Sequence, residues 1–242
     1  LLVFLFIPIL YAVYISAFDW DVLSEKTFVG FQNYQNMLKD EMFFRSIWIT
    51  LRYSIIYVVL VFVLSLIMAV FVQSLRNKYL QQTARIAIYL PNTISTIVAA
   101  TVWIFLFEAR NGYLNRWLTA VGIGRQDFLG STSQALICVV VVGVWLVVGY
   151  DMIIFLSALK DVPESYYEAA RLDGANCIQQ FFKITFPLIK DTSVFIAITT
   201  IIGSFQVFDQ IRVMTNGGPG GSTTVTVFYI YQLAFEKYQF GY

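Results

Sequence analysis

Five long apolar runs dominate the sequence and limit what it can fold into. They lie at about residues 1–18, 47–74, 86–107, 134–159 and 190–212. A helix needs about 20 apolar residues to cross the hydrocarbon core of a bilayer, and its backbone polar groups must be satisfied within the segment. The runs therefore predict an all-α membrane protein, a polytopic helical bundle that forms one transmembrane domain over residues 1–242.

Composition agrees with a membrane protein and argues against several other classes. Hydrophobic residues make up 58% of the chain and charged residues 13%, with a mean hydropathy of +0.70, which is rare in soluble domains. The net charge of +1 argues against nucleic acid as a partner. Because the chain has no histidine and two cysteines, we expect no metal site, no catalytic residues and no disulfide framework.

Basic residues in the short connections predict the orientation. Arg76, Lys78 and Arg85 lie between the second and third runs without any acidic residue, and Lys and Arg are enriched in cytoplasmic loops. This end is therefore predicted to face the cytoplasm, with connections 19–45 and 108–133 outside and segment 160–189 inside. The first run lacks the charged leader of a signal peptide, so it is expected to span the membrane.

Segment 160–189 is charged and helix-prone, unlike its surroundings. Asp161 as N-cap, Pro163 in the first turn and Gly174 as a left-handed stop predict a helix of about three turns. Asn176 is expected to cap a second short helix, which Pro187 ends or kinks. Physical reasoning leaves two interpretations open here, an amphipathic interfacial connector and a docking element for a partner protein.

Motif spacing in this segment resembles a known family. Glu168-Ala169-Ala170, then Gly174, then Ile184 and Pro187 are spaced as in the EAA loop of ABC importer permeases, with Phe186 where Leu is usual. Further stretches resemble the carbohydrate-uptake branch, the MalF and UgpA type of permease. These are Phe31-Gln32-Asn33-Tyr34, Leu90-Pro91-Asn92, Phe205-Gln206-Val207-Phe208-Asp209 and Thr215-Asn216-Gly217-Gly218-Pro219.

The resemblance implies the type I ABC importer permease fold (MetI-like), a six-span core of which five spans are present. The chain starts without Met and stops after an amphipathic approach, so we expect a fragment whose sixth span follows Tyr242. Implied partners are a sister permease in a heterodimer, two copies of a cytoplasmic ABC ATPase, an external solute-binding protein and the bilayer of a bacterial or archaeal cytoplasmic membrane. Residues implied to couple to the ATPase are Glu168, Ala169, Ala170, Asp173 and Gly174.

ATP hydrolysis is expected on the separate ATPase subunit. The chain contains no G-x-x-x-x-G-K-[ST] phosphate loop, and the glycine-rich stretch 217–221 lacks the required Lys and Ser or Thr. We therefore expect no cofactor on this chain, with ATP and Mg bound by the partner, and no enzymatic activity of its own.

Polar residues within the runs are candidates for the substrate path, because polar groups are costly in lipid unless they line a cavity or meet a partner. Asn92 and Thr96 are four residues apart, hence on one face of a continuous helix. Hydrogen bonding within or between helices is the competing explanation. Including positions that match sugar contacts in the maltose type of permease, the predicted path comprises Asn92, Thr96, Tyr150, Ser204, Gln206 and Val207.

The predicted function is thus a permease subunit that forms the path for a sugar or oligosaccharide. A non-sugar solute such as glycerol phosphate is the first alternative. A secondary transporter is less favoured, since the chain shows no internal repeat and no mid-span carboxylate cluster. A membrane enzyme would need converging nucleophile, base or metal ligands, which the scattered carboxylates do not provide.

Overall fold

The computed structural model describes residues 2–242, in which almost all regular structure is helical. Two short strands, β1 (Phe18–Asp19) and β2 (Thr27–Phe28), form an antiparallel hairpin with Phe18 opposite Phe28. The α-helices are α1 (Ile7–Ile15), α2 (Gln32–Met37), α3 (Glu41–Ser74), α4 (Lys78–Tyr89), α5 (Thr96–Leu106), α6 (Tyr113–Ala120), α7 (Ala135–Lys160), α8 (Glu164–Leu172), α9 (Cys177–Gln180), α10 (Phe186–Leu188), α11 (Lys190–Phe205), α12 (Asp209–Met214) and α13 (Thr226–Tyr231). The π-helical segments are η1 (Leu2–Phe6), η4 (Phe181–Thr185) and η5 (Gln232–Glu236), and the 3₁₀ segments are η2 (Leu90–Thr93) and η3 (Phe128–Gly130).

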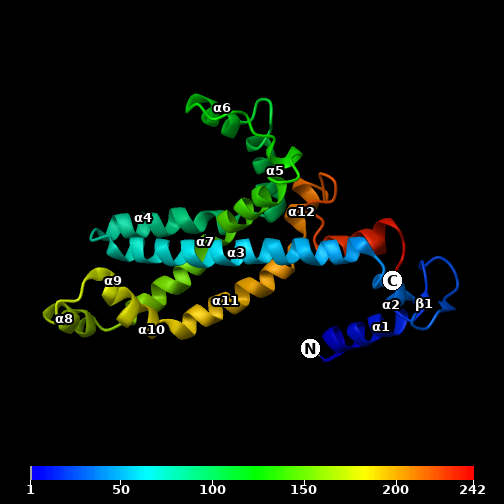
Figure 1. Cartoon of the computed structure of the whole chain (residues 1–242). Coiled ribbons are helices and arrows are strands. Elements are labelled where there is room, and N and C mark those ends of the chain that lie inside the picture. The colour runs from blue at the N-terminus through cyan, green and yellow to red at the C-terminus, as the bar shows by residue number, and fades with distance from the viewer. Residues whose placement is uncertain (1) are drawn as a thin grey trace.

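Helices α3, α7 and α11 form the axis of the molecule (Figure 1). Among residues 2–242, α3 and α7 are each long and apolar enough to cross a membrane alone. Two bent helix pairs also qualify when each pair is taken as one span. Figure 1 places α8 and α9 at one end of this axis, and α2, β1 and the C-terminus at the other.

The third apolar run is not one continuous helix, although the bent pair that contains it is long and apolar enough to be one broken span. α4 and η2 meet α5 at an angle of 98°, with Ile94 and Ser95 extended between them. Pro91 lies in η2, where its missing N–H and fixed ring oppose a regular helix. Asn92 and Thr96 therefore belong to different segments, and the inference that they share one helix face fails.

The fifth run is also broken. A bend of 72° between Leu188 and Lys190 separates the α9–α10 segment from α11 just before this run, which confirms the break or kink predicted at Pro187. α11 ends at Phe205 instead of continuing to 212, and α12 begins a new direction and packs against α5. Arg212 forms its ion pair with Glu236, with Nη1 2.8 Å from Oε1, and not with the nearby Asp209.

The first run forms η1 and α1, and helix ends at Ile15, short of the predicted boundary at 18. Leu1 lies outside the described residues. No residue of α1 is buried within this chain, as expected for an apolar helix that contacts lipid or another subunit. In this run the structure has a short apolar helix, Val3–Ile15.

Hydrogen bonds tie the C-terminal segment to the loop after α1. Asn33 Nδ2 lies 2.9 Å from the carbonyl oxygens of Ser16, Phe18 and Gly241. These contacts fasten the last residues of the sequence to the end of the bundle that carries the β-hairpin.

Asp40 forms a second tie at this end, because it caps α3 through the Met42 amide and also accepts hydrogen bonds from the hydroxyls of Tyr229 and Tyr242. Burial alone would raise the pKa of the Asp40 carboxyl, but these hydrogen bonds outweigh burial and hold its pKa below 3.8. The carboxylate therefore joins the start of α3 to the C-terminal segment.

Candidate functional site

A cavity of about 200 Å³ lies where the two helix breaks face α3. The break before α5 contributes Thr96, and the break between α11 and α12 contributes most of the rest. Broken helices expose polar backbone and side-chain groups that a continuous span would use internally, which suits a solute site. Its lining residues are Tyr53, Tyr57, Thr96, Gly203, Gln206, Val207, Phe208, Asp209 and Gln210.

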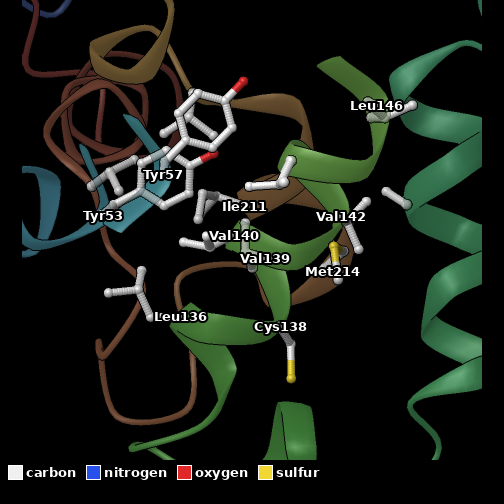
Figure 2. Close-up of a cluster of buried hydrophobic side chains, with 14 of the residues drawn as sticks. Tyr53, Tyr57, Leu136, Cys138, Val139, Val140, Val142, Leu146, Ile211 and Met214 are labelled. Atoms are coloured by element: carbon white, nitrogen blue, oxygen red, sulfur yellow. The ribbon is translucent and has the colours of Figure 1, made fainter. Parts of the chain in front are cut away.

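Two tyrosines of α3 form one wall of this cavity. Tyr53 and Tyr57 are four residues apart and stack, with ring centroids 5.4 Å apart and an interplanar angle of 15°. Figure 2 shows both rings beside Val140 and Ile211. A Cβ added to Gly143 of α7 would lie 3.0 Å from the Tyr53 hydroxyl oxygen and 3.0 Å from Tyr57 Cε2, so this glycine leaves room for the tyrosine pair.

The structure brings three of the predicted path residues together at this cavity. Thr96, Gln206 and Val207 all line it. Thr96 comes from the start of α5, while Gln206 and Val207 follow the last turn of α11. Residues more than a hundred positions apart in the sequence thus meet in one polar space.

Three other predicted path residues lie outside the cavity. Asn92 donates from Nδ2 to the Leu146 carbonyl of α7 at 3.3 Å. Ser204 is fully buried, and its hydroxyl donates to the Ile201 carbonyl at 2.7 Å. Tyr150 is half exposed on α7. Asn92 and Ser204 thus make the helix-bonding contacts that were the competing explanation for polar residues in spans.

Sequence reasoning missed several lining residues. Tyr53 and Tyr57 carried a usable signal, since two hydroxyls at i and i+4 mark one face of an otherwise apolar helix. Phe208, Asp209 and Gln210 could not be placed from sequence, because their position depends on where α11 stops.

The charge carried by the cavity lining is negative. Asp209 is the one charged residue among the lining residues. A second acid, Asp151, does not line the cavity but is buried between α7 and α11, where the Thr200 hydroxyl lies 3.3 Å from its Oδ2. Asp151 therefore contributes to packing between α7 and α11 and not to the cavity lining.

The predicted coupling residues lie on α8 and the turn that follows it. Glu168, Ala169, Asp173 and Gly174 are exposed and Ala170 is partly buried. α8 begins after Pro163 without a side-chain cap, so the prediction of an Asp161 N-cap is wrong. Proline itself sits at the N-cap, since its fixed φ leads directly into the helix and it has no N–H to satisfy.

Gly174 ends α8 with a φ of +78°. The Ala175 amide donates to the Ala170 carbonyl at 2.9 Å and the Gly174 amide donates to the Arg171 carbonyl at 3.1 Å. This pair of bonds is the Schellman motif, which requires a left-handed residue and therefore favours glycine. The predicted role of Gly174 as a helix stop is confirmed.

The second short helix is capped as predicted. The Asn176 side chain accepts from the Gln179 amide and the Gln179 side chain accepts from the Asn176 amide, a capping box. The Tyr167 hydroxyl lies 2.9 Å from Thr185 Oγ1, which ties α8 to η4. Segment 160–189 is thus a compact helical unit at one end of the bundle (Figure 1).

A helical membrane bundle with two broken spans around a polar cavity, and an exposed two-helix unit at one end, has the architecture of a transport permease. Residues 63–240 match the family described as binding-protein-dependent transport system inner membrane component. The chain belongs to this family, and the predicted resemblance to ABC importer permeases is confirmed.

Individual relatives agree with this assignment. The chain is 35% identical to "Probable ABC transporter permease protein YurN" of Bacillus subtilis (strain 168), over all of this chain and 84% of the relative. It is 32% identical to the trehalose/maltose transport system permease protein MalF of Thermococcus litoralis, over 99% of this chain and 80% of the relative.

A solved structure supports the fold. A bacterial ABC transporter involved in the import of alginate superposes with a TM-score of 0.84 at 24% identity, covering 99% of this chain and 82% of that chain. The predicted all-α importer permease fold is therefore confirmed.

Proposed function

We propose that this permease carries a neutral sugar or oligosaccharide, and that the cavity between the two helix breaks is part of its path. The observation that supports this is the lining itself, which combines the amides of Gln206 and Gln210, the hydroxyl of Thr96 and the stacked pair Tyr53 and Tyr57. Amides and hydroxyls match sugar hydroxyl groups, and aromatic side chains supply apolar surface. The trehalose/maltose relative agrees with this solute class.

A phosphorylated solute such as glycerol phosphate fits the cavity less well. Phosphate groups are bound by Arg, Lys or clustered backbone N–H groups. The charged lining residue is Asp209, an acid, which would repel phosphate. A neutral polyhydroxylated solute meets no such repulsion.

The cavity volume favours a second subunit in the path. Small-molecule sites usually enclose about 300–1,000 Å³, whereas this cavity encloses about 200 Å³. We infer that a sister permease completes the site in a heterodimer and that an external binding protein delivers the solute. The proposed location is a bacterial or archaeal cytoplasmic membrane.

ATP would be hydrolysed on two copies of a separate ABC ATPase, which would also bind Mg. We assign docking on that ATPase to the last turns of α8 and the turn that follows, comprising Glu168, Ala169, Ala170, Asp173 and Gly174. Glu168 would pair with a basic group, and the small alanines would allow close backbone approach. The absence of a phosphate loop from the sequence supports the proposal that ATP is bound and hydrolysed on a separate subunit.

Reconstitution with its partners in vesicles tests the proposal. Uptake of labelled oligosaccharide should require ATP and be blocked by vanadate, and Gln206→Ala should lower uptake without changing assembly. Gln35→Ala, in the distant helix α2, serves as the matched control. Uptake that is insensitive to vanadate would show that transport is not driven by ATP hydrolysis. Normal uptake by Gln206→Ala would show that the solute site does not include this cavity residue.

A further inference from the structure

Two cavities adjoin on the surface of the bundle near the C-terminal end of α3. One, of about 360 Å³, has a mixed lining, in which Gln73, Tyr167, Arg171 and Gln180 lie among apolar side chains such as Leu159 and Phe181. The other, of about 460 Å³, is lined only by apolar side chains of α3 and of the segment that contains η4 and α10. Val70 and Phe181 line both cavities, so the two spaces are neighbours.

The apolar cavity has the dimensions and exposure of a site for an acyl chain. Its α3 wall runs from Val63 to Val70, which is about 10 Å along a helix and falls within one leaflet of about 15 Å. Ile67 of this wall is 54% exposed and Phe182, on the opposite wall, is 64% exposed. Neither side chain is covered by another part of the described chain.

The polar side chains of the 360 Å³ cavity have the chemistry of a site for a phosphate head group. Arg171 is the one charged residue among its lining residues. Among residues 2–242 the side-chain ion pair is Arg212–Glu236, so Arg171 has no carboxylate partner there. A guanidinium binds phosphate through paired N–H donors. The Gln73 and Gln180 amides each donate one hydrogen bond to a backbone carbonyl, of Leu159 and Ala175 respectively, and each keeps a second N–H beside the cavity.

We propose that the joined cavities hold one anionic phospholipid of the leaflet that the basic connections predict to be cytoplasmic. Its phosphate contacts Arg171, and one acyl chain lies between α3 and Phe182. A groove that is cationic at the membrane boundary and apolar toward the bilayer centre matches the charge distribution of an anionic phospholipid, and basic pockets between helices at the cytoplasmic side bind such head groups. The site links α8 to α3 through a lipid and does not depend on which solute is carried.

Lipid binding to the full chain in its transporter complex tests this proposal. The complex is incubated with phosphatidylglycerol or phosphatidylcholine of equal chain length, and bound lipid is counted by native mass spectrometry. Arg171→Gln should weaken phosphatidylglycerol binding about tenfold while sparing phosphatidylcholine, since one charged hydrogen-bond partner is lost. Val70→Trp should reduce binding of both lipids by filling the shared wall.

Arg76→Gln is the matched control, because Arg76 carries the same charge at the same membrane face but lines neither cavity. It should bind both lipids as the unmodified complex does. Equal melting temperatures of the variants would show that folding is intact. If Arg171→Gln still prefers phosphatidylglycerol to phosphatidylcholine as the unmodified complex does, the proposal is overturned. Disulfide cross-linking of Phe182→Cys to the sister subunit also overturns it, because it would show that protein covers the groove.

Discussion

Replacing Gly174 by alanine should uncouple the permease while leaving its membrane domain intact. Gly174 has a φ of +78°, and an added Cβ would meet no atom within 4 Å. The cost of the substitution is therefore backbone strain alone and not steric overlap. A non-glycine residue in the left-handed region costs about 1–2 kcal/mol.

This strain falls on a helix with little else to hold it. α8 has no buried residue, so packing cannot compensate for a weakened C-terminus. A loss of 1–2 kcal/mol lowers the ratio of capped to frayed forms by a factor of about 5–30. We expect amide exchange at residues 174 and 175 to accelerate by that factor, and solute-stimulated ATP hydrolysis by the assembled transporter to fall.

Gly122 provides a matched control elsewhere in the chain. It follows α6 with a φ of +84°, has no atom within 4 Å of an added Cβ, and sits in the same pattern of hydrogen bonds. Gly122→Ala should therefore speed local amide exchange as much as Gly174→Ala does, yet leave ATP hydrolysis unchanged. Gly174→Asn should be milder than alanine, because asparagine tolerates the left-handed region.

Two outcomes would refute the reasoning. If exchange at residues 174 and 175 were unchanged in Gly174→Ala, the cap would not depend on glycine. If both alanine variants reduced stimulated ATP hydrolysis equally, the effect would reflect general strain and not the docking role of α8.

Other sites give further predictions. Gly143→Val should displace the Tyr53–Tyr57 pair and lower the stability of the fold by about 1–3 kcal/mol through overpacking, which thermal unfolding would measure. It should also lower solute uptake more than Gly143→Ala does. Equal uptake by the two variants would contradict this. Asp40→Asn keeps the helix cap but loses the charged acceptor of two tyrosine hydroxyls, so protease should cleave the C-terminal segment faster. Because the pKa of Asp40 is lowered, its stabilising effect is present above about pH 3.8 and is lost as the pH falls through the lower folded-state value; unfolding that is equally acid-sensitive in Asp40→Asn would refute this assignment.

Much of the fold could be predicted from local sequence. The apolar runs located α3, α7 and the two bent helix pairs that are long and apolar enough to cross a membrane, because lipid tolerates few polar residues whatever the tertiary contacts. Gly174 and Asn176 marked helix ends correctly because caps depend on neighbouring backbone groups.

The helix breaks could not be predicted in the same way. Residues 86–107 are uncharged, so the sequence predicts one span. In the structure, the segment that contains Pro91 meets α5 at an angle of 98°. Proline permits a kink or a break, and tertiary packing selects between them. The candidate site depends on these breaks, and of the predicted path only Thr96, Gln206 and Val207 line the cavity.

α11 connects segment 160–189 to the cavity as a single straight helix. It starts at Lys190, directly after that segment, and ends at Phe205, next to cavity residue Gln206. Its 16 residues span about 24 Å. Because the chain is bent or broken at both ends of α11, a tilt imposed at the Lys190 end can move the cavity end without bending the helix.

Loosening this helix in the middle should therefore weaken coupling while both ends stay intact. Ile198 is suitable because it is exposed near the centre of α11. Ile198→Gly and Ile198→Ala remove nearly the same side chain, but glycine also costs about 1 kcal/mol of helix propensity and adds backbone freedom. Solute-stimulated ATP hydrolysis should fall further in the glycine variant. Equal values in the two variants would show that α11 does not transmit motion as a rigid element.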